Sequence, residues 1–232
     1  MRKRTVAGLA AILACSIALG AFEAVTIKAT PKEGDTFKYR QTGKFDVNGM
    51  EVDTSAVETR KVLKVDAVGN VSIKEEVTDV KFNGQDVPEG SAPPPKTVTS
   101  TSKGVLVKVE GDKVDENDYR EDNLESVVYP DKPVNAGDSW TADIKGDKTT
   151  GAVDAKGTFT YVGEETVNGA GAFKIKFSIK EVGDAGASTD GAFWLSKGDA
   201  TLLKYVSKWT NVPISGVGPV SGDIILTRVT SQ

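Results

Sequence analysis

The sequence predicts an all-β protein made of antiparallel strands with one short connecting helix. Segments in which apolar and polar residues alternate recur along most of the chain, and such alternation requires one face in an apolar interior and the other in water. Turns rich in Gly, Asn and Asp separate these segments at intervals of about eight to twelve residues. Only residues 111–129 place apolar groups at roughly helical spacing. A curved sheet, a half-barrel, a closed barrel and a sandwich all satisfy this pattern.

A duplicated unit organises the chain. The stretch from Pro133 to Trp140 repeats, roughly a hundred residues later, the proline, Gly-Asp turn, hydroxyl residue and aromatic found from Pro31 to Phe37. Two further pairs of segments correspond at similar spacing: 69–74 with 171–176, and 102–104 with 196–198. The meanders are expected to form either one large curved sheet or two half-barrels packed face to face. We expect four regions: a signal peptide at 1–20, a first β-meander at 21–110, an acidic connector with the helix at 111–132, and a second β-meander at 133–232.

The N-terminus has the features of a secretory signal. Three cations at positions 2–4 precede an apolar run at 6–22, and small residues at 18 and 20 favour cleavage after Gly20. Two alternatives stay open. Residues 12–15 resemble a lipobox whose Cys15 would carry a diacylglyceryl anchor, and an uncleaved segment would itself be an anchor, at the short end of the roughly 17–25 residues that a span needs. The predicted location is periplasmic or secreted in a bacterium, with membrane attachment only if the chain is lipidated or the signal is uncleaved.

The composition of the mature chain restricts its partners. Cys15 is the only cysteine, so a chain cleaved after Gly20 forms no disulfide and its fold rests on its core. Loss of the three cations at positions 2–4 takes the formal charge from −4 to −7. A moderately acidic surface suits solubility and argues against nucleic acid or anionic lipid headgroups as electrostatic partners.

The first half predicts a series of hairpins. We expect strands at 25–27, 37–41, 45–47, 52–57, 60–65, 71–82, 97–101 and 105–109, with hairpin turns at 48–49 and 83–84. Val71 and Ile73 occupy one parity of their strand, whereas Val80 and Phe82 occupy the other, which predicts a bulge near residues 75–76. The proline-rich residues 88–95 are expected to form an extended surface loop.

The acidic connector contains the one helix candidate. Residues 111–129 carry apolar groups at roughly helical spacing, and Pro130 is expected to stop the helix. Asp112, Asp115, Asn117 and Asp118 resemble the composition of a calcium loop. The glycine and glutamate that an EF-hand loop requires are missing, so we interpret the segment as a solvated connector and predict no metal site.

The second half has the more regular pattern. Residues 173–180 alternate between apolar and polar without a defect. A loop of small residues is expected at 183–191, with the next strand beginning around Phe193. A strand at 202–209, a loop at 212–222 and a closing strand at 224–229 complete the expected fold.

The sequence offers little for catalysis. It has no histidine, and the cleaved chain has no cysteine, so a nucleophile paired with imidazole is excluded. Paired carboxylates remain a formal possibility. The acids lie beside turns or in the connector, where capping and solvated roles are the ordinary interpretation. We therefore predict a protein that is not an enzyme and has no cofactor.

Large rings concentrate in the second half, and two interpretations of them stay open. In the first they are the core of a domain without disulfides. In the second a curved sheet leaves part of the lining open to an acyl chain or similar apolar ligand. The residues predicted to line such a cavity are Trp140, Phe159, Phe177, Trp194 and Trp209.

The Pro-x-x-x-Gly-Asp-Ser-Trp stretch at 133–140, preceded by Tyr129-Pro130 and a short helical segment, resembles an uncharacterised family of exported bacterial proteins, many of them lipoproteins. This resemblance implies an extracytoplasmic β-rich protein with no known activity. The layout is also similar to the curved half-barrels of lipoprotein carriers such as LolA and LolB, although the helix complement is smaller here.

Together these features predict a non-catalytic envelope protein whose role is binding. The expected partner is an apolar small molecule or a lipid. A structural or interaction module that contacts another envelope protein is the alternative, and nucleic acid is not an expected partner.

Overall fold

The computed structural model describes residues 23–47, 49–88, 90–183 and 186–229. The predicted signal peptide at 1–20 and Cys15 lie outside these residues. Within them the chain forms one helix and twelve strands: β1 Thr36–Val47, β2 Met50–Val65, β3 Val71–Phe82, β4 Gln85–Asp86, β5 Lys96–Ser100, β6 Leu106–Glu110, α1 Glu116–Leu124, β7 Ser139–Ile144, β8 Ala155–Val167, β9 Ala170–Glu181, β10 Ser188–Ser196, β11 Leu202–Ile214 and β12 Gly218–Arg228.

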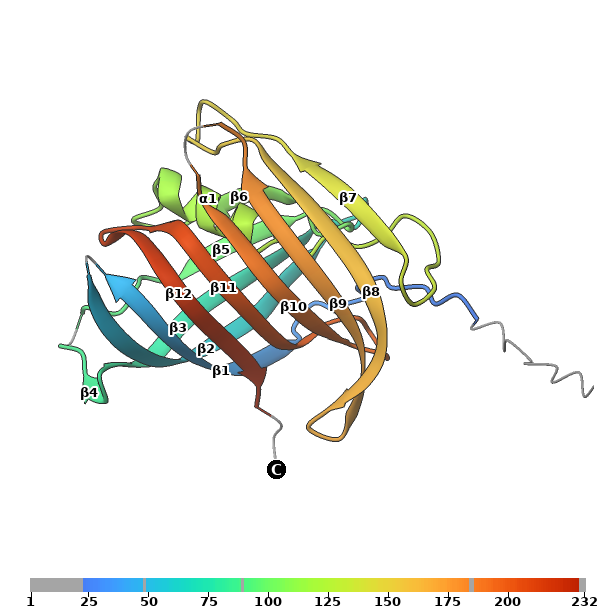
Figure 1. Cartoon of the computed structure of the whole chain (residues 1–232), viewed down its shortest axis with the longest axis horizontal. Helices are drawn as coiled ribbons and strands as arrows, with labels where there is room; N and C mark the ends of the chain where they lie inside the picture. Colours follow the sequence, from blue (N-terminus) through green and yellow to red (C-terminus); the bar gives the residue numbers. More distant parts are fainter. Residues whose placement is uncertain (1–22, 48, 89, 184–185, 230–232) are drawn as a thin grey trace, which may run out of the picture.

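All twelve strands belong to one antiparallel sheet that curls on itself (Figure 1). The strand order is β6-β5-β3-β2-β1-β12-β11-β10-β9-β8-β7, with β4 paired to β3. The first and last strands of the chain meet at the centre, where Tyr39 of β1 lies opposite Arg228 of β12. One continuous curled sheet therefore forms, with β6 and β7 as its two edges, and the predicted all-β fold with one short helix is confirmed.

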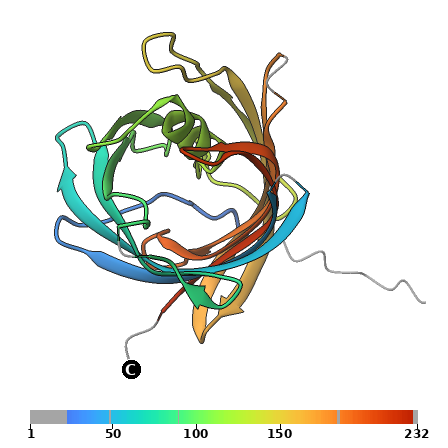
Figure 2. The same cartoon turned by 90° about the vertical axis from the view of Figure 1, so that its left-hand side faces the viewer.

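Helix α1 lies inside the curl (Figure 2) and contacts β6, β9 and β11. Its start is specified by a capping box, in which the Asp115 side chain accepts from a backbone amide of the first turn and Asp118 reaches back to the amide of Asp115. The helix ends at Leu124, well before the expected stop at Pro130. That expectation was wrong because Val127 and Val128 pack in the core from a segment that is no longer helical.

Several predicted hairpins are present as expected. Val47 pairs with Met50, so two residues connect β1 to β2. Asn83 and Gly84 both have positive φ, 51° and 77°, as the favoured hairpin turn requires. The pairing of β5 with β6 also matches the prediction, as does the loop expected at 88–95 over residues 88 and 90–95.

The bulge in β3 was predicted at the wrong place. Glu75 and Glu76 pair in regular register with Arg60 and Thr59 of β2. The shift that changes parity lies further along, where the register jumps between Thr78 and Lys81 of β3. Asp79 adopts a φ of 52° there, a conformation that aspartate tolerates better than β-branched residues do.

Three other boundaries differ from the prediction. Residues 25–27 make only an isolated bridge, in which Val25 and Val134 exchange two backbone hydrogen bonds of 2.9 Å. β10 begins at Ser188, inside the loop expected at 183–191, and the loop expected at 212–222 is mostly the hairpin of β11 and β12. Pro213 lies opposite Pro219 in that hairpin. An antiparallel ladder allows prolines at an opposed pair of residues that exchange no N–H···O=C hydrogen bonds.

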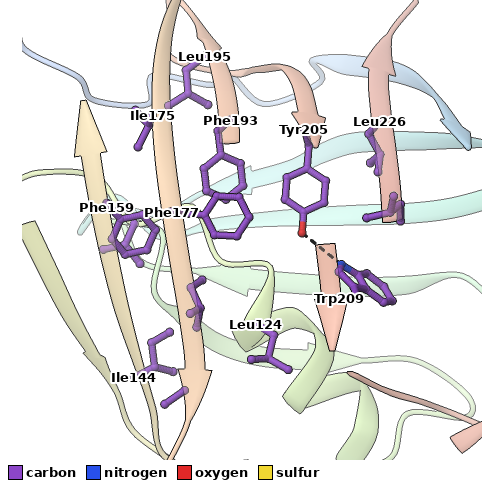
Figure 3. Packing of buried hydrophobic residues seen from close by; sticks show 14 of the residues in the cluster. Leu124, Ile144, Phe159, Ile175, Phe177, Phe193, Leu195, Tyr205, Trp209 and Leu226 are labelled. Carbon is purple, nitrogen blue, oxygen red and sulfur yellow. Dashed lines mark hydrogen bonds between the residues drawn. The ribbon is translucent and has the colours of Figure 1, made fainter. Parts of the chain in front are cut away.

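The core fills the concave side of the second half (Figure 3). From Phe173 to Glu181 of β9, buried residues alternate with half-buried or exposed ones, so that Phe173, Ile175, Phe177 and Ile179 are all buried. Leu124 of α1 is fully buried in the same cluster and closes it from the inside of the curl.

Candidate functional site

Three stacked rings form an aromatic wall on the inner face of the sheet. Phe177 of β9, Phe193 of β10 and Tyr205 of β11 have ring centroids 4.3, 5.3 and 5.7 Å apart. Burial raises the pKa of Tyr205 well above its usual value, and the nearby carboxylate of Glu125 adds to this. We call Phe177, Phe193 and Tyr205 the aromatic wall.

Four of the five predicted lining residues lie on this inner face. Phe159, Phe177 and Trp209 are at most 5% exposed. Trp140 is half-buried, stacks on Phe159 at 5.8 Å, and donates from Nε1 to the carbonyl oxygen of Val128 at 2.9 Å. Phe177 stacks within the aromatic wall, and the ring of Trp209 lies 5.5 Å from that of Phe45.

Trp194 does not join them, because it lies on the outer face of β10. Its neighbour Phe193 points inward, and successive residues of a strand point to opposite faces. Trp194 lies opposite Lys174 of β9 and Lys204 of β11, and donates from Nε1 to Glu165 at 2.6 Å. The alternation of side chains along a strand already predicts from the sequence that Phe193 and Trp194 point to opposite faces.

The inner face of the first half is charged rather than aromatic. Arg60 of β2 lies opposite Glu75 of β3, which lies opposite Lys96 of β5. The Nε atom of Arg60 is 2.5 Å from Glu58 and 3.5 Å from Glu75. All four side chains are at most 24% exposed, so the charges face the interior and not the solvent.

Helix α1 adds carboxylates to this group. The ammonium of Lys96 is 2.8 Å from Asp122, and Glu121 and Glu125 also contribute charge there. Asp122 Oδ2 and Glu125 Oε1 are buried without a hydrogen-bond partner in the structure. We call this group the inner charged cluster; it consists of Glu58, Arg60, Glu75, Lys96, Glu121, Asp122 and Glu125.

Burial dominates the acid–base behaviour of the cluster. It raises the pKa of Glu75 to about 7, against the opposing effect of Arg60, and that of Asp122 to about 6, against Lys96. Burial also raises the pKa of Glu121, and that of Glu125 well above its usual range. This cluster was not predicted from the sequence. Glu58 and Arg60 nevertheless alternate in step with the inward-facing Val62 and so lie on the same face of β2.

Polar contacts to both halves of the sheet hold α1 in place. Arg120 makes a two-point ion pair with Glu181 of β9, with both distances 2.8 Å. The hydroxyl of Tyr119 donates to the carbonyl of Val109 in β6 at 3.0 Å, and Thr189 of β10 donates to the carbonyl of Leu124. The helix therefore crosses the interior from one side of the curl to the other.

Two of the acids that resembled a calcium loop act in the helix cap. Asp115 and Asp118 cap the helix, and both accept from the hydroxyl of Ser215 in the β11–β12 hairpin, at 2.6 and 3.1 Å. Across the residues that the structure describes, no group of three or more potential ligands is placed to hold a metal ion.

Two shallow pockets lie on the outside of the described chain. One, of about 580 Å³, is bounded by β6, the start of α1 and the loop around Thr149 and Thr150. The other, of about 380 Å³, lies on the outer face beside Trp194 and Lys204, where the β8–β9 hairpin overhangs them.

No helix among the described residues has the length and hydropathy needed to cross a bilayer.

Neither a protein-family model nor a curated protein matches this chain. The resemblances to an uncharacterised family of exported bacterial proteins and to lipoprotein carriers therefore stay predictions.

Solved structures similar to this chain have low sequence identity. A candidate exported protein with a YmcC-like fold from Bacteroides fragilis is 14% identical, with 89% of this chain and 100% of that chain covered and a TM-score of 0.36. A DUF1329 family protein from Desulfovibrio piger is 12% identical, with 85% of each chain covered and a TM-score of 0.26. DynF from the dynemicin biosynthesis pathway of Micromonospora chersina is 8% identical, with 98% and 92% covered and a TM-score of 0.21. At these values the likenesses assign no activity to this chain.

Proposed function

We propose that this protein is a non-catalytic binding protein of the bacterial envelope, and that it holds a lipid-like amphiphile against the aromatic wall in the place that α1 fills in this structure. One observation carries the proposal. The helix that lies inside the curl is polar, and Leu124 is the only aliphatic side chain it contributes to the core. A helix with so few apolar groups can be displaced from the stacked rings by a more apolar ligand.

The energies of the contacts support an exchange of α1 for a ligand. Leaving the core costs about 1.5–3 kcal/mol for a leucine side chain. Displacing the helix also separates Arg120 from Glu181 and Lys96 from Asp122, at a cost of roughly 3–5 kcal/mol for each pair. Each methylene that a ligand buries returns about 0.8 kcal/mol, so an alkyl chain of roughly ten to sixteen carbons offsets these costs.

The inner charged cluster favours a ligand with a polar end that donates hydrogen bonds. Glu125 lies at the border between the cluster and the aromatic wall, since its carboxylate acts on the pKa of Tyr205. Glu75 and Lys96 lie on the sheet and stay in place when α1 leaves, whereas Asp122, the ion-pair partner of Lys96, leaves with the helix. A hydroxyl headgroup beside the wall would donate to Glu75 and accept from Lys96.

Tryptophan fluorescence tests the proposal directly. The chain has three tryptophans, two on the inner face and Trp194 outside, so Trp194→Phe leaves only the inner reporters. We expect 12-bromo-1-dodecanol to quench the emission of Trp194→Phe by contact with the bromine, with saturation. Unbrominated 1-dodecanol, the matched control, should compete for the site and cause no quenching.

A second variant separates the exchange of α1 from binding elsewhere. Leu124→Ala removes the one aliphatic contact of the helix and should tighten alcohol binding by several-fold while keeping the β circular dichroism. Saturable quenching that is absent in Trp194→Phe, or an affinity that Leu124→Ala leaves unchanged, would contradict binding in place of α1.

A further inference from the structure

The outer face of the central strands is basic, although the whole chain is acidic. Register and alternation assign each side chain of β9–β12 and β1 to one face. The cations on the outer face are Lys38, Arg40, Lys44, Lys174, Lys176, Lys180, Lys204 and Lys208. The carboxylates on the same strands and face are Asp46, Asp190 and Asp223. The formal charge of the chain is −4, so charge is strongly segregated.

The excess of positive charge gathers at one end of these strands. Toward the other end, Lys208 lies opposite both Asp190 and Asp223, and Lys44 also lies opposite Asp223, so charges there are balanced. The basic end contains one continuous row across five strands, about 19 Å long at the usual strand spacing. From β9 to β1 its members are Lys174, Trp194, Lys204, Thr227 and Arg40.

Trp194 places an aromatic ring in the middle of this row. The ammonium groups of Lys174 and Lys204 are 4.9 and 5.0 Å from the centre of its ring. Glu165 is the one carboxylate that overhangs the row, and it is neutralised by Lys174 at 2.8 Å. Beside the row Ile225 is 40% exposed, so the surface combines a tryptophan, an aliphatic group and two further cations, Lys204 and Arg40.

The pocket of about 380 Å³ opens on the same row. Trp194, Lys204 and Thr227 form its floor, and residues 165–168 of the β8–β9 hairpin form its overhang. Asn168 at the tip of this hairpin donates to the carbonyl oxygen of Arg228 at 3.4 Å, which places the tip over the end of β12. The pocket thus presents an ammonium, a hydroxyl and an indole ring at the basic end of the face.

We propose that this outer basic face, defined as Lys38, Arg40, Lys174, Lys176, Trp194 and Lys204, docks on the surface of an anionic lipid bilayer. Charge complementarity identifies the partner, because lysines and arginines within a Debye length of an anionic bilayer attract it. Tryptophan is the side chain suited to the level of lipid headgroups, since its ring is apolar and its N–H is polar. The acidic remainder of the chain is repelled, which orients the curl with this face toward the lipid.

Docking on anionic lipid differs from the expectation drawn from net charge alone. A formal charge of −7 for the cleaved chain argued against anionic headgroups, but net charge says nothing about how charges divide between the faces of a sheet. Docking on a bilayer is independent of amphiphile binding inside the curl, and either proposal can fail while the other holds.

Vesicle flotation tests the docking. The mature protein should float with phosphatidylglycerol vesicles at low salt, remain unbound to phosphatidylcholine vesicles, and be released as the salt concentration rises. Lys176→Gln combined with Lys204→Gln should lower the partition by about 25-fold, at about five-fold for each cation removed. Lys113→Gln combined with Lys132→Gln, two exposed lysines outside this face, removes the same charge and is the matched control.

The control variant should bind nearly as the unmodified protein does. Equal losses for the two double variants, equal flotation with both lipids, or insensitivity to salt would each overturn the proposal. So would a complete lack of flotation with phosphatidylglycerol, which would turn the search toward an acidic protein partner. Unchanged thermal unfolding of both double variants shows that charge, and not folding, determines the result.

Discussion

Two ion pairs of this chain have similar chemistry and very different surroundings. Arg120 pairs with Glu181, whose side chain is only 2% exposed, whereas Lys103 pairs with Asp131 on the surface, where both side chains are more than 60% exposed. Removing one partner of a buried pair leaves an uncompensated charge in a medium that solvates it poorly. An exposed charge is solvated by water whether or not its partner is present.

We expect Arg120→Ala to lower the free energy of unfolding by roughly 3–5 kcal/mol, because the carboxylate of Glu181 then stays buried without a partner. Lys103→Ala, the control, should change it by less than about 1 kcal/mol. Urea unfolding of both variants at neutral pH measures the difference. Similar losses in the two variants would mean that Glu181 reaches water when Arg120 is removed.

Helix α1 is held by its ends as much as by its faces. With two buried residues, Asn123 and Leu124, it has little apolar surface to fix it against the sheet. The carboxylate of Asp115 caps the first turn and also accepts from Ser215, which joins the helix to the β11–β12 hairpin. These hydrogen bonds, that of Ser215 foremost, lower the pKa of Asp115, so its ionised form is the one that the folded chain stabilises.

Asp115→Ala should destabilise the helix by about 0.5–2 kcal/mol, since a first-turn amide loses its acceptor. Hydrogen exchange should therefore become several-fold faster in the amides of α1 and stay unchanged in the central strands. Asp112→Ala alters a neighbouring exposed acid outside the cap and should have no such effect. Faster exchange throughout the sheet after Asp115→Ala would show that the helix and the sheet unfold together.

The whole molecule combines an acidic interior with a basic outer face. The inner charged cluster brings five carboxylates but only two cations, Arg60 and Lys96, to the concave side of the first half. Burial penalises the charged forms of these acids and raises the pKa of Glu75 to about 7, so this carboxyl is partly protonated at neutral pH. Folding therefore binds protons, and the stability of the whole chain depends on pH.

We expect the free energy of unfolding to fall by a few kcal/mol between about pH 4 and pH 8. The pKa values of Asp122 and Glu75 in the folded chain, about 6 and about 7, lie above those of the unfolded chain. The stabilisation is therefore complete below the unfolded values and is lost as pH rises through the folded ones. Urea unfolding at a series of pH values measures this slope.

Glu75→Gln supplies the control for this slope, because it keeps the size of the side chain and removes its titration. The variant should resemble the unmodified protein near pH 5 and lose less stability toward pH 8. Groups whose pKa is lowered by hydrogen bonds, such as Asp66 and Asp199, should destabilise the protein again at strongly acidic pH. A stability that increases from pH 5 to pH 8 would contradict the role assigned to the cluster.

The sequence by itself determined the class of the fold and most strands, because these depend on local properties. Alternation requires a sheet with one buried face, and Asn-Gly pairs favour the positive φ that tight hairpins need. The alternation within β10 also separates the inward Phe193 from the outward Trp194. The prediction that Trp194 lines the inner cavity overlooked this alternation, although it is visible in the sequence.

Only the tertiary structure decided how the strands close into one sheet and what lies on each side. The pairing of Tyr39 with Arg228 joins residues far apart in the sequence, and such contacts depend on the packing of the whole core. Arg60, Glu75 and Lys96 become a cluster only when β2, β3 and β5 align in register. The basic row from Lys174 to Arg40 arises in the same way, because each strand supplies one member and no single segment of sequence contains the pattern.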